Sequence, residues 1–350
     1  MTGDSMLDLI VKILAALFVF GLVVFVHELG HFVTAKMSGI KVNEFAIGMG
    51  PTLFHFGKGE TKYALRLFPI GGFVSMEGED EESNDERSYT RAPLKNRILV
   101  IIAGGVMNLI LGFVILTVLV SNEHAITSRT VAEFLPNAST QASGLQVGDE
   151  IVGVNGRRCF IANDLIYEFL RTQNGIADLE VIRSGQRITL DNVKFDTQPT
   201  EDENLKTIVI DFRVLPIEKT PITVVKEAGL WTCSLARMVF LSVMDLITGR
   251  VAVNTLAGPV GVVSVISDAV SYGWDSLAMV MALITINLGV FNLLPVPALD
   301  GGKLFLLLVE AIRRKPIPEK YEIFINSAGF VLLMGLMAFA TFNDIAKLLK

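Results

Sequence analysis

The feature that constrains this chain most is an apolar segment near its amino terminus that ends in two histidines and a glutamate. Residues 13–26 contain no charge, and the apolar character continues to residue 35 around His27, Glu28 and His31, which form an H-E-x-x-H pattern. About 20 apolar residues are enough for a helix to cross a bilayer. A cleavable signal peptide has a shorter apolar core with a small-residue cleavage site after it, so we predict a retained membrane helix.

The composition agrees with a membrane protein. The 350 residues are 51% hydrophobic and 19% charged, with a mean hydropathy of +0.53. Soluble domains carry about 25% charged residues. The net charge of −6 gives no reason to expect nucleic acid as a partner, whereas a lipid bilayer is expected. The two cysteines, Cys159 and Cys233, are too few for a disulfide framework or a four-ligand zinc site and are predicted to be small buried residues.

Three further segments predict membrane helices, which makes four in all. Residues 98–120 and 323–342 carry no charge, and residues 277–309 are apolar but interrupted by polar residues, glycines and prolines. An acid inside such a broken apolar segment marks a candidate functional site. Lysine and arginine are concentrated between the first two segments and between the last two, so both of these loops are predicted to be cytoplasmic. The middle region, about residues 121–276, would then lie outside.

The segments between these helices predict β structure. Short alternating strands with a hairpin signal at Gly57–Glu60 follow the first helix, which suggests a sheet that dips partly into the bilayer. Exposed strand edges do not persist in lipid, so this sheet must be shielded or must pair with an extended peptide. Residues 127–214 predict a small mixed α/β module, with a short helix at Asn163–Gln173. Residues 230–247, which carry two charges, predict a surface-lying or packed amphipathic helix.

The H-E-x-x-H pattern predicts a zinc site. Two histidines four residues apart share one face of a helix and can bind one Zn²⁺, while Glu28 can act as general base toward a zinc-activated water. A catalytic zinc has three protein ligands, and Asp300, an acid beside two glycines in an apolar helix, is the best third candidate. His55 and His124 are weaker candidates, because one lies in the strand region and the other at the outer end of a predicted helix.

Simpler interpretations exist for each of these residues. Alone, the five-residue pattern can occur by accident or as two structural histidines on a helix. Asp300 alone could be a helix cap or a buried hydrogen-bonded acid. Together, at one predicted depth in two membrane helices, they favour zinc. Asn292 could hydrogen-bond an unwound substrate strand, and Pro295 and Pro297 keep their segment irregular; the alternative is that they only shape a loop.

The motifs together resemble the site-2 protease family (M50), and within it the bacterial PDZ-containing regulators of sigma-factor proteases. The matching segments, in chain order, are HELGH, GMGP (Gly48–Pro51), FPIGGFVSMEGE (Phe68–Glu79), GGVMN (Gly104–Asn108, with Gly105 where a proline often stands), AGPVG (Ala257–Val260 and Gly261) and NLLPVPALDGG (Asn292–Gly302). The resemblance covers essentially the whole chain. One PDZ module is visible here, where the enterobacterial members have two.

The resemblance implies a fold and a set of roles. The fold would be a polytopic α-helical membrane protein with a membrane re-entrant β region and one inserted PDZ domain. His27, His31 and Asp300 would bind zinc and Glu28 would be the catalytic base, while Asn292, Pro295 and Pro297 would contact the substrate. The family cuts transmembrane segments of single-span proteins, such as anti-sigma factors and remnant signal peptides, after an upstream site-1-type protease has trimmed them. A bacterial inner-membrane location, with the PDZ domain on the extracytoplasmic side, would follow.

The expected domains follow from the same resemblance. They are residues 7–120 with two transmembrane helices, the HELGH and the re-entrant β region (40–78); residues 127–214 as the PDZ domain; residues 221–270 as amphipathic or linking helices; and residues 277–348 with the last two transmembrane helices and the LDGG motif.

Two other classes of function compete with an intramembrane zinc endopeptidase. One is a membrane receptor or scaffold whose PDZ module binds peptide tails and whose metal is structural. A structural zinc site usually has four protein ligands, and only three credible ones are present. The other is a transporter with Asp300 as ion carrier. Transporters often show repeated halves, and the sequence shows none.

Overall fold

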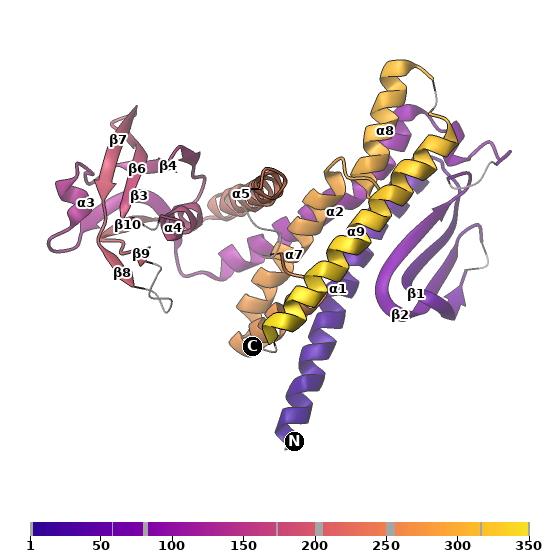
Figure 1. Ribbon diagram of the computed structural model, residues 1–350, viewed down its shortest axis with the longest axis horizontal. Helices are drawn as coiled ribbons and strands as arrows, with labels where there is room; N and C mark the ends of the chain where they lie inside the picture. The colour runs from indigo at the N-terminus through magenta and orange to yellow at the C-terminus, as the bar shows by residue number, and fades with distance from the viewer. Residues whose placement is uncertain are drawn as a thin grey trace. The chain divides into compact units, whose positions relative to one another are not determined.

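The computed structural model describes residues 3–57, 59–79, 83–172, 174–199, 206–249, 256–315 and 317–348. The chain divides into two compact units. The first comprises Met1–Ile115 and Ala236–Lys350, and the second comprises Leu116–Leu235. Figure 1 labels the elements of both.

The first unit is built mainly from helices, several of them long and apolar. They are α1 (Gly3–Met37), most of α2 (Leu94–Asn122), the end of α5 (Pro221–Ile247), α6 (Pro259–Tyr272), α7 (Trp274–Leu293), α8 (Asp300–Arg313) and α9 (Glu319–Leu348). Glycines let α2 and α7 approach closely, because a Cβ on Gly289 would lie 2.8 Å from the carbonyl oxygen of Gly105. Small residues at helix contacts are typical of membrane proteins, where lipid supplies no hydrophobic force between helices.

Five of the helices are long and apolar enough to cross a membrane by length and composition: α1, α2, α5, α7 and α9. The sequence predicted four spans and assigned residues 230–247 to an amphipathic helix. Those residues form the last two thirds of the 27-residue helix α5, whose mean hydropathy of 1.5 is the lowest of the five. The interrupted segment 277–309 is two helices, α7 and α8, separated at residues 294–299.

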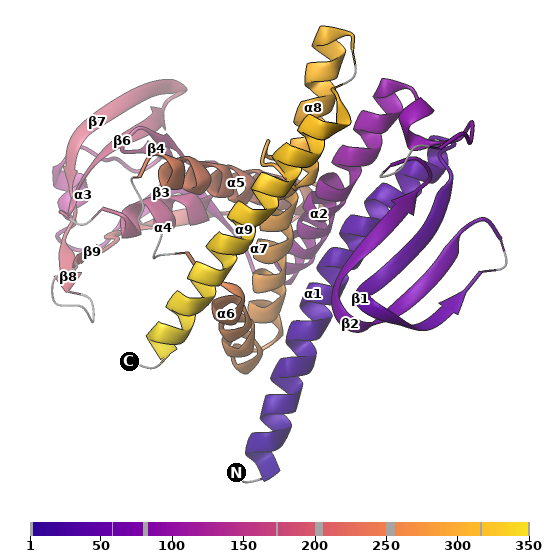
Figure 2. The same cartoon turned by 45° about the vertical axis from the view of Figure 1, so that its right-hand side comes forward.

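Two long strands form a sheet beside α1, as Figures 1 and 2 both show. Strand β1 (Val42–Phe56) and strand β2 (Lys62–Met76) each double back, so that the first part of β1 lies between the two halves of β2. Ile47, for example, is paired with both Gly72 and Leu65. The second half of β2 is therefore an edge of this sheet, as far as the described residues show.

One face of this sheet packs on α1 through aromatic side chains. Phe45 of the sheet contacts Phe25 and Phe32 of α1, with ring centroids 6.0 and 5.0 Å apart. Elsewhere on this sheet, large apolar side chains are exposed, including Met49, Leu53, Phe54, Phe56, Leu65, Leu67 and Phe68. Exposed apolar side chains in this number favour contact with lipid or protein over contact with water.

The second unit is a mixed α/β module. Its elements are β3 (Ile126–Phe134), α3 (Ser139–Ala142), β4 (Glu150–Val154), β5 (Arg157–Arg158), α4 (Ala162–Leu170), β6 (Ile176–Arg183), β7 (Gln186–Lys194), β8 (Thr197–Pro199), β9 (Lys206–Ile208), β10 (Phe212–Ile217) and the first half of α5. The main sheet has the order β10-β3-β4-β6-β7. Two of its turns have positive φ, at Asn155-Gly156 and at Ser184-Gly185. The predicted short helix corresponds to α4.

A buried ion pair in this unit yields a stability prediction. Asp149 is fully buried and accepts hydrogen bonds from the Arg183 guanidinium at 2.8 and 2.7 Å. Arg183→Leu would leave a buried carboxylate without its cation, so we expect a loss of about 3–5 kcal/mol of unfolding free energy in this unit. Arg187→Leu is the control, since Arg187 is 58% exposed and 3.6 Å from Glu180. Native-state amide exchange of β4 and β6 measures the loss of stability in each variant. If Arg183→Leu and Arg187→Leu destabilise the unit equally, the prediction is wrong.

A second stability prediction concerns Glu77, which directly follows β2. Hydrogen bonds from the Ser83 hydroxyl, the Asn43 amide and the Lys41 ammonium lower the pKa of Glu77 to about 2. A carboxyl with a lowered folded-state pKa stabilises the fold above its unfolded pKa, near 4.5, and this contribution is lost as the pH falls toward 2. Amide exchange of residues 83–89, corrected for intrinsic rates, should therefore rise below about pH 4.5. Glu77→Gln should remove that dependence.

Candidate metal centre

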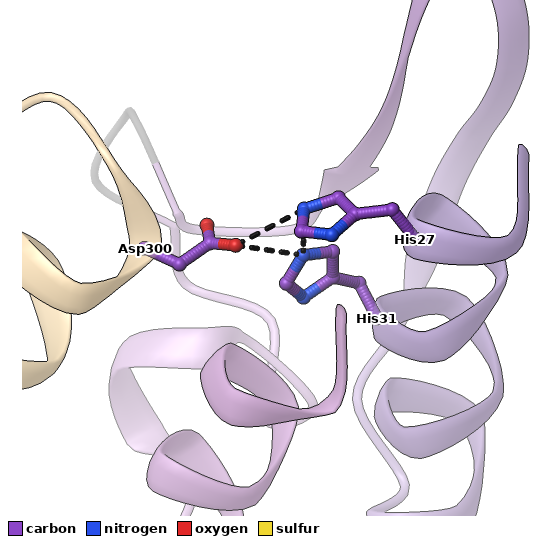
Figure 3. Close-up of side chains that lie close together, drawn as sticks. All are labelled: His27, His31 and Asp300. Carbon is purple, nitrogen blue, oxygen red and sulfur yellow. Dashed lines mark hydrogen bonds and ion pairs between the residues drawn. The ribbon is translucent and has the colours of Figure 1, made fainter. Parts of the chain in front are cut away.

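The two histidines of the H-E-x-x-H pattern lie one helical turn apart on α1 and point toward a single side chain of α8. The Nε2 atoms of His27 and His31 are 3.2 Å from one another. Asp300 Oδ2 lies 3.1 Å from the first nitrogen and 3.3 Å from the second (Figure 3). The structure thus brings together the three residues that the sequence singled out as ligands, with their ligand atoms all within 4.8 Å of one another.

The donor set fits a zinc ion. Both histidines are 9% exposed, and Asp300 Oδ2 is buried without a hydrogen bond of acceptable geometry, although two nitrogens lie close to it. Lone pairs that converge in this way repel one another unless a proton or a cation lies between them. Two imidazole nitrogens and one carboxylate oxygen are ligands that Zn²⁺ accepts, and three protein ligands leave a position open.

Neighbouring groups orient each imidazole for this role. His31 Nδ1 lies 2.8 Å from the carbonyl oxygen of Val100, so Nδ1 carries the proton and Nε2 keeps a lone pair. His27 Nδ1 lies 3.4 Å from the Asn108 side-chain nitrogen, while Asn108 Oδ1 is buried without a partner. Turning this amide over would let Oδ1 accept the Nδ1 proton of His27 and satisfy both groups. Val100 and Asn108 both belong to α2.

Helix α2 can support the histidines because Gly104 lets it come close. A Cβ at this position would lie 2.7 Å from His27 Cε1 and would overlap His31 Nε2. No other residue type leaves that space. The sequence analysis placed Gly104 in the GGVMN motif but gave it no role. Its position one helical turn before Asn108 is the feature of the sequence that could have indicated one.

Glu28 lies on the side of α1 that faces the sheet. A Cβ on Gly72 of β2 would be 3.1 Å from Glu28 Cγ, so the glutamate side chain lies directly beside the edge half of β2. A glutamate next to a ligand histidine has the position that a general base needs. The close approach of Glu28 to β2 requires a glycine at position 72, as the approach of α2 to the histidines requires one at position 104.

The segment between α7 and α8 holds Asp300 in a tight turn. Ala298 has a positive φ of 70°, and a Cβ on Gly302 would be 2.5 Å from the carbonyl oxygen of Val296. Helix α9 packs against this turn, since a Cβ on Gly329 would be 2.7 Å from the carbonyl oxygen of Pro297. Asn326 of α9 accepts a hydrogen bond from the Ala298 amide at 3.4 Å. Neither α9 residue was singled out in the sequence.

The remaining candidates lie elsewhere. Asn292 is buried near the end of α7, and Pro295 and Pro297 lie in the turn before Asp300. His55 is exposed on β1, and His124 is exposed in the second unit, so neither joins the cluster.

The prediction for the cysteines is only half right. Cys159 is buried in the core of the second unit, but Cys233 is exposed on α5 and is not a buried residue as predicted. A helix of alternating exposure can present one small apolar side chain outward, which its sequence alone does not reveal.

Gly104→Ala tests the approach of α2 to the histidines. The added Cβ must displace one imidazole or α2 itself. We therefore expect zinc affinity to fall about 10- to 100-fold, as it does when a group that orients a ligand is lost. Gly21→Ala in α1 is the control, because a Cβ there meets nothing within 4 Å. Zinc per chain, measured on purified protein across a chelator series, should separate the two variants. Equal zinc retention would contradict this account.

Comparison with known proteins agrees with this geometry. Residues 15–336 match the model of peptidase family M50. A protein of Clostridium perfringens named as a zinc metalloprotease is 38% identical over 95% of this chain and 98% of its own length. The regulator of sigma-W protease RasP of Bacillus subtilis is 30% identical over 96% of this chain and 98% of its own, and zinc metalloprotease RasP of Shouchella clausii is 31% identical over 96% and 99%. The chain therefore belongs to peptidase family M50, the site-2 protease family, and is a metalloprotease.

Proposed function

We propose that this metalloprotease uses zinc to cut peptide bonds within the membrane, in transmembrane segments of single-span proteins. The observation that carries the proposal is the convergence of His27 and His31, on the long apolar helix α1, with Asp300 of α8. Ionisable groups inside a membrane-spanning segment are energetically costly, so they are found where they serve a function. The relatives named as zinc metalloproteases support zinc as the metal.

The residues divide the chemical work. His27, His31 and Asp300 hold the metal, and zinc, when bound, supplies the positive charge that makes a water acidic and polarises a carbonyl. Glu28 takes the proton from the attacking water as the oxygen bonds to the scissile carbon. It then delivers a proton to the departing nitrogen, so the products are a carboxylate and an amine.

The substrate must present an extended backbone. A helix hides its peptide groups in its own hydrogen bonds, so a transmembrane substrate has to unwind before it is cut. The edge half of β2 runs beside Glu28 and offers backbone groups to which an extended segment could pair. Asn292, Pro295 and Pro297 also contact the substrate strand in this proposal.

The finer biological assignments rest on the family. The second unit contains the PDZ domain, residues 127–214, on the extracytoplasmic side of a bacterial inner membrane, with α5 as a linking helix. The substrates are proteins already trimmed by an upstream site-1-type protease, such as anti-sigma factors and remnant signal peptides. The name of the Bacillus subtilis relative, a regulator of sigma-W protease, supports the anti-sigma substrates.

Glu28→Gln is the variant that tests the chemistry. It keeps the shape of the side chain and removes its basicity, so cleavage of a tagged single-span substrate should fall at least about 100-fold, within the range that general bases contribute. Zinc per chain should stay at the wild-type level. Asp300→Asn, compared at equal abundance, should lose both zinc and cleavage.

His55→Gln is the matched control, since His55 is exposed and outside the cluster. It should cut as the wild type does. Undiminished cleavage by Glu28→Gln would show that another protease is responsible for the observed product.

A further inference from the structure

An ion pair joins the end of the edge strand to the helix that carries Asp300. The Lys303 ammonium lies 2.8 Å from Glu79 Oε1. Glu79 comes three residues after Met76, the last residue of β2, and Lys303 comes three residues after Asp300, the first residue of α8. Both residues belong to the first unit.

The pair is partly removed from water. The Glu79 side chain is 17% exposed and that of Lys303 is 40% exposed. Apolar packing lies beside it, because Met76 of β2 and Leu304 and Leu307 of α8 belong to one hydrophobic cluster. Water screens this charge pair less than a pair on an open surface, so its attraction, and the repulsion after charge reversal, are stronger than for fully exposed charges.

The two ends of the pair are anchored independently of it. On one side, Glu77 and its partners Lys41, Asn43 and Ser83 organise the loop after β2. On the other side, the glycine-lined turn before α8 fixes Asp300. The ion pair is therefore not needed to fold either element, but it adds a direct connection between them.

We propose that the Glu79–Lys303 pair sets the spacing between the edge strand that holds the substrate and the helix that holds Asp300. Both are positioning residues in this proposal, because their contact joins the end of β2 to α8. The proposal rests on the proposed function, in which the extended substrate pairs with β2 and is cut at the metal. A scissile carbonyl that is displaced by about 1 Å loses much of its reactivity, so this spacing decides turnover.

Charge reversal provides the test. Glu79→Lys and Lys303→Glu each place two like charges together, and the double variant restores the pair with its signs exchanged. We expect each single variant to cut a single-span substrate at least ten-fold more slowly while keeping wild-type zinc per chain. The double variant should recover to within about three-fold of the wild type, as expected for a pair whose energies are coupled.

Matched controls separate the pair from a general effect of charge. Glu86→Lys makes the same charge change at an exposed position in the same loop, and Arg313→Glu does so at the exposed end of α8. Both should cut at the wild-type rate. Loss of folded protein would instead lower zinc per chain in step with activity.

A second readout does not depend on cleavage. In the Glu28→Gln background, amide exchange of residues 71–79 should rise in each single reversal and return to the starting level in the double reversal. Glu79→Gln and Lys303→Gln give milder versions should a reversal fail to fold.

The outcomes are distinct. Recovery of both cleavage and exchange in the double reversal supports the proposal. Single reversals that behave like the wild type, or a double reversal as impaired as the singles with zinc retained, would overturn it. If Glu28→Gln itself still cuts, the proposed function fails, and the exchange measurement then decides on the ion pair alone.

Discussion

The membrane part of this protein depends on bringing one aspartate from α8 to within 3.3 Å of two histidines on α1. Such a cluster is expensive to bury among apolar helices, and removing one partner from a buried charged group costs several kcal/mol, about 3–5. The neighbouring elements are shaped to permit it. Gly104 of α2 leaves space for the two histidines, and Gly72 of β2 leaves space for Glu28, because neither glycine has a side chain.

The break between α7 and α8 follows from the same requirement. A continuous helix would carry Asp300 past the histidines, since each residue rises 1.5 Å along the axis. The chain turns instead through Leu294–Leu299, and irregular backbone at membrane depth is tolerated only where protein packs around it. Helix α9 provides that packing, with Gly329 against Pro297 and Asn326 on the amide of Ala298. A peripheral helix of mostly exposed side chains thus supports the turn that carries a metal ligand.

The two units obey different physical rules, and this affected how well each could be predicted. In the second unit, period-two strands and turn residues such as Asn155-Gly156 specify the local structure, and the predicted short helix was confirmed. In the first unit, long apolar runs indicate spans but carry little information about which helix faces which. Hydropathy therefore predicted four spans, whereas α5 also reaches the necessary length and apolar character.

The sequence by itself determined the class of protein, the positions of the apolar helices and the residue types of the candidate site, because H-E-x-x-H and the acid beside two glycines are local patterns. Only the tertiary structure decided which groups surround them. The carbonyl of Val100, the amide of Asn108, the space at Gly104 and the Glu79–Lys303 pair all involve residues far apart in the chain. Contacts of this kind arise from helix and strand packing, and packing depends on the shapes of two surfaces at once, which one local sequence does not encode.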